Sequence, residues 1–129
     1  MRHLASGPGP EERPRQLIES YGEGGFRVSG TAHKGSIVVL PERTEGWAVA
    51  DISKLTLKSL AAVTGADPPA EILLLGCGAR IARVPEVLRA QLKKHGIIVE
   101  PMDTGAACRT YNLLIAEGRR VAGALIAIE

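Results

Sequence analysis

The C-terminal half of the chain alternates between two hydrophobic periods, and this alternation constrains the fold most strongly. Three short apolar runs suited to buried strands are separated by two longer segments with helical spacing. The connections are short, so right-handed crossovers would make the strands parallel neighbours in a sheet covered by helices. The expected strands are 72–75, 97–101 and 121–128, and the expected helices are 85–95 and 104–117.

The first third of the chain predicts a β-meander. Two β-capable runs flank a glycine-rich turn at 22–25 and form a hairpin. A second turn is expected at 30–35, where His33 and Lys34 lie, and the strand that follows it stops at Pro41. The expected strands of this part are 16–21, 26–29, 36–40 and 47–49.

Between these two parts, Thr56 is placed to cap a helix that ends at Gly65. We therefore expect a single three-layer α/β domain over residues 16–129. Its central mixed sheet has a C-terminal parallel βαβαβ part, and the N-terminal meander forms an additional β layer, either by extending the sheet or by packing separately. Residues 1–15 are rich in proline, glycine and charge and predict a disordered arm.

The composition is typical of a soluble globular protein and disfavours several functions. The chain has 129 residues, a net charge of +2 and only 3% aromatic residues, which is a poor basis for binding nucleic acid. No apolar run approaches the roughly 20 residues of a membrane span, and the N-terminus has no secretory h-region. Cys77 and Cys108 lack zinc or disulfide spacing, which favours free thiols in a reducing cytoplasm.

The helix expected after residue 103 has two different sides. Asp103 or Thr104 can cap its first amides, and Gly118 can end it in a left-handed conformation. At 100° per residue its apolar side chains share one broad face, while Arg109 and Asn112 lie about 60° apart on the opposite side. This polar pair needs a partner. Two alternatives remain: recognition of another molecule, or an internal network that holds the helix to the meander.

A candidate binding crevice lies where two neighbouring parallel strands end. Ligands of open α/β sheets bind outside the carboxyl ends of the strands. Here those ends carry Cys77 and Arg80 after one strand, and Asp103 and Thr104 after the next, with Arg109 nearby. The helix amides after residue 104 could hold an anion or a carboxylate. Alternatively, Asp103 and Thr104 only cap the helix, and the glycines beside Cys77 only permit a tight turn.

The sequence contains no recognisable catalytic motif. The Gly76-Cys77-Gly78 segment lacks the third glycine of the dinucleotide fingerprint, and the next helix begins too late to hold a pyrophosphate. P-loop, zinc-protease and nucleophile-elbow motifs are absent. Cys77 has no recognisable histidine partner for nucleophilic catalysis, and a redox pair with Cys108 would need a proximity that sequence does not define. We predict no catalytic residue, no metal site and no cofactor.

The helix after residue 103 also carries a resemblance to a known family. Its pattern Thr104-x-x-Ala107-x-x-Thr110-Tyr111-Asn112 resembles domain-of-unknown-function family 498, and weaker similarity covers 26–30, 35–37 and 73–78. The resemblance implies a three-layer α/β fold with an extra β layer and no established enzymatic activity or cofactor. It also implies a role in binding proteins during respiratory-complex assembly, as for the best-described member. Many relatives have a hydroxyl residue in place of Cys77, which argues against a family-wide thiol mechanism.

We therefore expect a non-catalytic, protein-binding, assembly-factor-like domain in the cytoplasm, either a monomer or a small homo-oligomer. The candidate ligand- or partner-binding residues are Cys77, Arg80, Asp103, Thr104, Arg109 and Asn112. The alternative is a small-molecule or anion-binding domain, with or without enzymatic activity, that uses the crevice at the ends of strands 72–75 and 97–101. A thiol-redox role ranks third.

Overall fold

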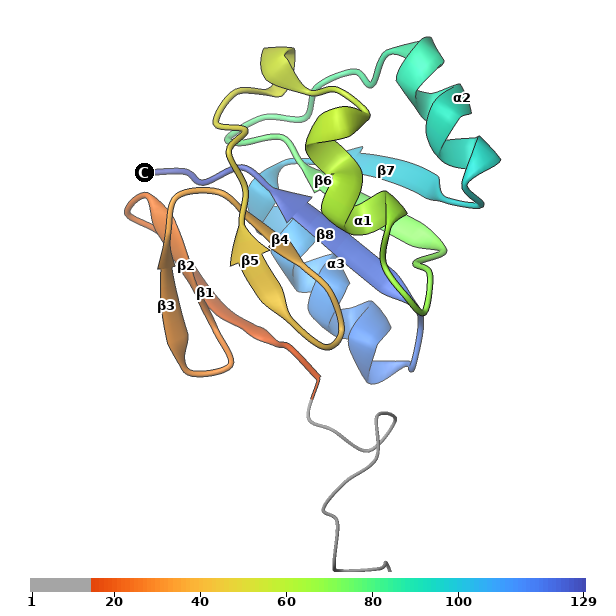
Figure 1. Cartoon of the computed structure of the whole chain (residues 1–129). Helices are drawn as coiled ribbons and strands as arrows, with labels where there is room; N and C mark the ends of the chain where they lie inside the picture. Colours follow the sequence, from red (N-terminus) through yellow and green to blue (C-terminus); the bar gives the residue numbers. More distant parts are fainter. Residues whose placement is uncertain (1–14) are drawn as a thin grey trace, which may run out of the picture.

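A five-stranded mixed sheet forms the centre of the computed structural model, which describes residues 15–129 (Figure 1). Its strands are β4 (Ile37–Val39), β5 (Thr44–Gly46), β6 (Ile72–Gly76), β7 (Ile98–Met102) and β8 (Val121–Leu125), in the spatial order β5-β4-β8-β6-β7. β6 pairs in parallel with both β7 and β8, whereas β4 pairs antiparallel with β8 and β5. The three C-terminal strands are therefore parallel neighbours, which confirms the prediction from the alternating periods.

Both faces of the central sheet are covered, which explains why β6 is a continuous apolar run. Leu73 and Leu75 belong to a core on one face, and Leu74 belongs to a core on the other. The first face packs against α2 (Glu86–Lys94), the single-turn helix α1 (Ala61–Thr64) and two 3-10 turns. The second face packs against α3 (Thr104–Ala116). A strand buried on both sides has no polar face, so it cannot show period-two alternation.

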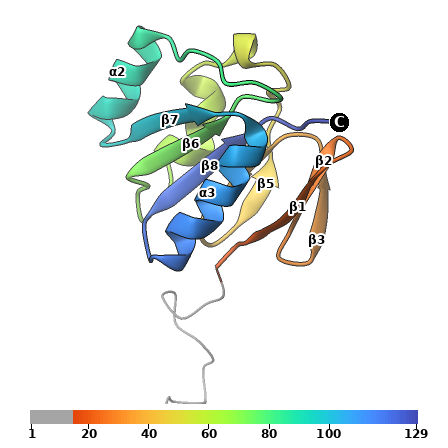
Figure 2. The same ribbon diagram turned by 180° about the vertical axis from the view of Figure 1, so that it is seen from behind.

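A separate antiparallel sheet lies beside α3 on this second face (Figure 2). It consists of β1 (Ile18–Gly22), β2 (Gly25–Val28) and β3 (Thr31–Lys34), in that order. The fold is thus the three-layer arrangement with an additional β layer that we expected. The first three strands of the meander form the extra layer, and its last two strands, β4 and β5, extend the central sheet.

Two local predictions were wrong, and a third was correct in its limits but not in its helix type. The segment at 30–35 is not a turn throughout, because it contains β3. The strand expected at 47–49 is irregular, and the edge strand β5 lies just before it at Thr44–Gly46, where it pairs with β4. The segment expected to be a helix capped by Thr56 and ended by Gly65 is helical at 58–64, but it begins as the 3-10 turn η3 (Lys58–Leu60) before α1. Thr56 Oγ1 accepts a hydrogen bond from Ser59 N (3.1 Å), Gly65 is the C-cap of α1, and Leu60 and Val63 are buried.

Two further boundaries concern the ends of the chain. β8 ends at Leu125, three residues before the expected end of the last strand. The residues after it contact the β1–β2 turn, where Gly24 N donates a hydrogen bond to Ile128 O (2.8 Å). The arm expected at 1–15 lies, apart from residue 15, outside the described residues. In the part that the structure describes, no helix has the length and apolar character needed to cross a bilayer.

Candidate functional site

The loops after β6 and β7 meet at the same end of the sheet, as the sequence predicted. Cys77 N donates a hydrogen bond to Met102 O (2.8 Å), and Thr104 N donates one to Gly78 O (2.8 Å). These bonds continue the pairing of the two strands beyond the register pair of Gly76 and Met102. The two loops are therefore joined directly by their backbones, without an intervening space at these positions.

Thr104 connects three segments at this junction. Its hydroxyl donates to Ile126 O (2.7 Å) and accepts a hydrogen bond from Gly78 N (2.9 Å), and its side chain is fully buried. Gly76 permits the close approach, since a Cβ atom there would lie 3.0 Å from Thr104 Oγ1. The hydroxyl thus satisfies buried backbone groups of the loop after β6 and of the segment after β8. Its use for a ligand remains a prediction.

Asp103 caps α3 in the way that its position predicted. It has an extended backbone conformation, and its carboxylate accepts a hydrogen bond from Ala106 N (2.9 Å). This bond satisfies one of the amides that the first helical turn leaves without a partner. The cap fixes the start of α3 next to the β6 loop, and Arg80 in that loop is exposed to solvent.

The two cysteines lie on opposite faces of the central sheet. Cys77 belongs to the core beneath α2, and Cys108 belongs to the core beneath α3. Both are free and buried. Burial raises the pKa of Cys108 to about 12, although the neighbouring Arg109 acts in the opposite direction. The Cys108 thiol is therefore protonated at neutral pH, and a protonated thiol is neither a nucleophile nor a metal ligand.

The polar side of α3 has β1 as its partner. Asn112 Oδ1 accepts a hydrogen bond from Ile18 N (2.9 Å), and Asn112 Nδ2 donates one to Ile18 O (2.8 Å). One turn earlier, Arg109 Nη1 donates to the hydroxyl of Tyr21 (3.2 Å). These contacts correspond to the internal network that holds the helix to the meander, one of the two alternatives left by the sequence.

The Tyr21 side chain of β1 lies close over a glycine of α3. A Cβ atom on Gly105 would lie 2.6 Å from the Tyr21 hydroxyl oxygen, so the helix offers room for this ring only because residue 105 has no side chain. Tyr21 is 40% exposed and Arg109 is exposed beside it. The outer end of the network is therefore open to solvent and accessible to a partner.

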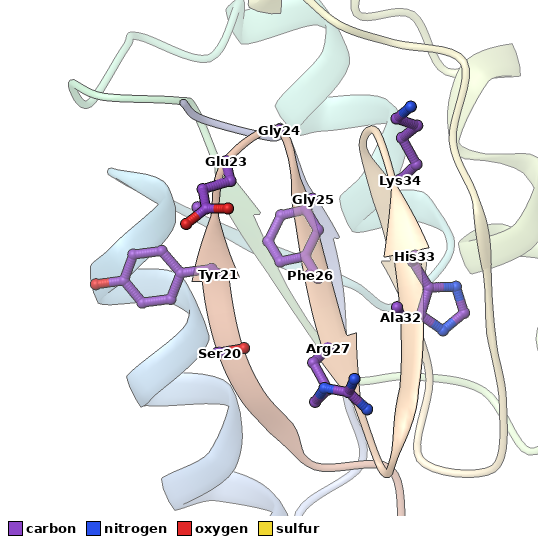
Figure 3. A pocket seen from close by; sticks show the side chains of 11 residues that line it. Ser20, Tyr21, Glu23, Gly24, Gly25, Phe26, Arg27, Ala32, His33 and Lys34 are labelled. Carbon is purple, nitrogen blue, oxygen red and sulfur yellow. The ribbon is translucent and has the colours of Figure 1, made fainter.

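The sequence interpretation missed a hollow of about 520 Å³ on the small sheet (Figure 3). Cross-strand register places Ser20 opposite Arg27, and Arg27 opposite Ala32, on the face away from the buried Phe26. The hollow exists because most side chains between its charged residues are small. Its lining is Ser20, Tyr21, Gly22, Glu23, Gly24, Gly25, Phe26, Arg27, Ala32, His33 and Lys34.

One signal could have indicated this hollow from the sequence. The glycine run at 22–25 extends from the turn into β2, and Arg27 and Lys34 follow it at positions that a hairpin and a third strand bring together. We expected a turn at 30–35, so Lys34 was not placed opposite Gly25, with which it pairs in β3. Glu23, an acidic residue, also lines the hollow.

Comparison with known proteins identifies relatives in bacteria and in animals. The chain is 38% identical over 109 residues to an uncharacterised protein of Rhodobacter capsulatus, covering 84% of this chain and 82% of that protein. It is 40% identical over 110 residues to NADH dehydrogenase (ubiquinone) 1 alpha subcomplex assembly factor 3 of Danio rerio. This match covers 85% of the chain and 63% of the Danio rerio protein, so the chain spans less than two thirds of that relative.

Solved structures have the same fold. An outer membrane protein of Bartonella henselae superimposes with a TM-score of 0.82 at 39% identity, covering 89% of this chain and 97% of that chain. A Mth938-like domain of Bordetella pertussis superimposes with a TM-score of 0.77 at 28% identity, covering 98% and 92%. A family model described as protein of unknown function (DUF498/DUF598) matches residues 18–126. This chain therefore belongs to the DUF498/DUF598 family, as the Thr-x-x-Ala-x-x-Thr-Tyr-Asn pattern of its last helix had suggested.

Proposed function

We propose that this chain is a non-catalytic protein-binding domain that acts in the cytoplasm as an assembly factor for a respiratory complex. The observation that carries this proposal is the 40% identity to the Danio rerio assembly factor over 85% of the chain. Such identity over most of a domain supports a shared fold and a related role. The match covers 63% of the Danio rerio protein, so the proposal concerns the shared domain.

The roles of the buried polar residues support a binding domain more than an enzyme. Thr104 and Asn112 direct their side-chain atoms to backbone groups of neighbouring segments, and Asp103 caps its own helix. Arg80 and Arg109 are exposed, and their charged groups are available to another molecule. Within the predicted set, Arg80 is the residue best placed to contact a partner, because Arg109 already donates to the Tyr21 hydroxyl.

The proposal can be tested in the source organism by deleting the gene and supplying the full chain with an affinity tag. We expect a lower amount of assembled respiratory NADH dehydrogenase on native gels after deletion, and a subunit or assembly protein of that complex bound to the tagged chain. Normal assembly of the complex in the deletion strain, together with no specifically bound protein, would contradict the proposal. A strain that carries the tag on an unrelated domain of similar size is the control.

A second candidate function, small-anion binding, is favoured by the hollow on the small sheet. Arg27 and Lys34 lie on its rim, and Gly25 and Ala32 lie between them. Titration of the labelled protein with inorganic phosphate and with acetate tests this by NMR. We expect saturable shifts at Gly25 and Ala32 that disappear in the Arg27→Gln/Lys34→Gln variant. The same spectra test the strand-end crevice, because the signal of Asp103 should shift if an anion binds there. Weak, non-saturating shifts at all positions would contradict both binding sites.

A further inference from the structure

Positive charge is concentrated in one short part of the chain. Residues 77–96 contain five of the sixteen Lys and Arg residues but only one of the fourteen Asp and Glu residues, so the remainder of the chain has a small acidic excess. The basic residues are Arg80, Arg83, Arg89, Lys93 and Lys94, and the acidic residue is Glu86. The modest net charge of the whole chain therefore conceals a locally basic segment.

This basic segment forms one outer region of the molecule. It comprises the irregular loop between β6 and α2, and α2 itself, which lies beside β7 at the edge of the central sheet (Figures 1 and 2). Two large apolar side chains in this region are strongly exposed: Ile81 at 64% and Val87 at 71%. Among the large hydrophobic residues of 15–129, these two have the highest exposure. We call the region from Arg80 to Lys94 the α2 surface.

The orientation of α2 leaves one of its sides without a partner in the described chain. Leu88 and Leu92 are buried against the sheet. Val87 and Lys94 are separated by seven residues, so they share a side of the helix that points away from these leucines. Both are exposed. The outward side of α2 therefore presents an aliphatic group and an ammonium group along one line.

The cationic side chains of the α2 surface are not neutralised by their described neighbours. Within residues 15–129, the ion pairs within 4.0 Å join Arg15 and Arg120 to Glu42 and Arg43 to Glu45, and none involves the α2 surface. Arg89 is different, since its Nη1 donates to Val99 O (3.2 Å). The charges of Arg80, Arg83, Lys93 and Lys94 are thus available for an anionic partner.

We propose that the α2 surface docks an acidic segment of a partner protein, with aliphatic residues of that segment packing on Ile81 and Val87. This inference rests on the proposed function, because it assigns a surface and a chemistry to the partner of the domain. Carboxylates opposite Arg80, Arg83 and Lys94 would complement the local positive potential, which speeds association and fixes orientation. The apolar contacts would supply the desolvated centre of the interface.

A second copy of the chain and a membrane fit this surface less well. In a symmetric dimer the same patch meets itself, so the cations would face one another. A membrane-bound helix inserts a broad apolar face with bulky side chains into the lipid. Here the apolar face of α2, with Leu88 and Leu92, is buried in the core, and Val87 is the exposed large hydrophobic residue of the helix.

The neighbouring edge of the sheet does not offer the partner a strand to extend. In β7, Pro101 has no N–H group to donate, and Val99 O already accepts the hydrogen bond from Arg89. Proline and covered carbonyls are common features of edge strands that avoid pairing. Docking is therefore expected through the side chains of the α2 surface.

Site-specific photocrosslinking in the source organism tests this proposal with the full chain. The crosslinking amino acid p-benzoylphenylalanine replaces Val87 in one strain and Leu113 in another. Leu113 is 59% exposed on α3, on the other face of the sheet, and serves as the matched control. We expect the Val87 position to crosslink to a segment of a partner protein in which Asp and Glu outnumber Lys and Arg, as identified by mass spectrometry of the crosslinked peptide.

Charge variants provide the second arm of the test. Arg80→Glu/Arg83→Glu should reduce the yield of this crosslink about tenfold or more, and Arg80→Lys/Arg83→Lys should largely preserve it. Arg43→Glu/Arg119→Glu changes the net charge equally outside the α2 surface and should leave the crosslink unchanged. Thermal unfolding of each purified variant excludes loss of folding as the cause, because all four arginines are exposed.

Several results would overturn the proposal. A crosslink from position 87 to the same protein, to lipid or to a segment without net negative charge would do so, as would a yield insensitive to Arg80→Glu/Arg83→Glu. If partners crosslink at position 113 but not at 87, protein binding stands and the α2 surface is the wrong site. If the tagged chain binds no protein at all, the proposed function fails together with this inference.

Discussion

Asn112 on α3 pairs with both backbone polar atoms of Ile18 on β1, with its Oδ1 2.9 Å from the Ile18 nitrogen and its Nδ2 2.8 Å from the Ile18 oxygen. The amide side chain thus replaces a neighbouring strand along this part of β1. This contact joins the small sheet to the helix that crosses the central sheet.

Replacing Asn112 should loosen the junction between the two β layers. Asn112→Ala leaves the N–H and C=O groups of Ile18 without their partner, and we expect a loss of about 2 kcal/mol in the free energy of unfolding. Urea denaturation measures this change. Leu113→Ala, at the exposed neighbouring position, is the control and should remain within about 0.5 kcal/mol of the wild type. Equal stability of the two variants would contradict the proposed role of Asn112.

Removing the Thr104 hydroxyl should cost more than removing another buried hydroxyl. Thr104→Val leaves Gly78 N and Ile126 O unpaired and should destabilise by about 2–3 kcal/mol, while Thr104→Ser should retain most of the stability. The matched control is Tyr111→Phe, because the buried Tyr111 hydroxyl has no hydrogen-bond partner among the described residues. We expect a change below about 0.5 kcal/mol for this variant. Thermal unfolding compares the three variants, and a larger loss in Tyr111→Phe than in Thr104→Val would refute this interpretation.

Arg109 should contribute little to stability, because its contact with Tyr21 lies at the solvent-exposed end of the network. We expect Arg109→Ala and Tyr21→Phe each to lower the free energy of unfolding by less than about 1 kcal/mol. In a double-mutant cycle measured by urea denaturation, the coupling between them should be small but favourable. Severe unfolding of Arg109→Ala would instead place this side chain in the structural core of the junction.

The buried thiol of Cys108 should make the protein less stable in alkaline solution. Its pKa is about 12 in the folded state and near 9.0 when exposed, so above pH 9 the unfolded chain releases a proton that the folded chain retains. Stability contributed by the protonated thiol is complete below pH 9 and is lost as the pH rises towards 12. The slope approaches about 1.4 kcal/mol per pH unit.

Comparison with Cys108→Ala between pH 8 and 10 isolates this effect. The variant should lose less stability than the wild type over this range, whatever its stability at pH 8. In native protein at pH 8, Cys108 should also react with iodoacetamide only slowly and become reactive on unfolding. Parallel pH profiles of the two proteins would show that the thiol is not the group that titrates.

The main predictions that failed concern segments whose structure depends on distant partners. Trp47 and Val49 have the alternating pattern of a strand, yet β5 forms earlier because Thr44 pairs with Val39 across a short turn. The indole nitrogen of Trp47 instead donates to Ser59 O (2.7 Å) and holds the following loop. Local hydrophobic pattern indicates which residues will be buried, but pairing decides which of them extend a sheet.

The candidate site was also predictable only in part, because local pattern placed its residues but tertiary packing decided their contacts. The sequence placed Cys77, Arg80, Asp103 and Thr104 at neighbouring strand ends, because parallel strands end on the same side of a sheet. Which hydrogen bonds these residues form depends on the tight packing of Gly76 against Thr104. The spacing of residues along the sequence does not indicate this packing. The α2 surface could not be predicted from the sequence either, because its exposed residues depend on which side of α2 the sheet buries.

The sequence by itself determined the order of strands and helices in the C-terminal half, the parallel core and the caps of α3, because each follows from short-range periodicity and from backbone groups within a few residues. The tertiary structure alone decided that Asn112 meets Ile18, that the two cysteines face opposite sides of the sheet and that four of the five basic residues of 77–96 are exposed. These relationships join residues far apart in the chain or depend on which face is covered, and only the packing of complete layers fixes them.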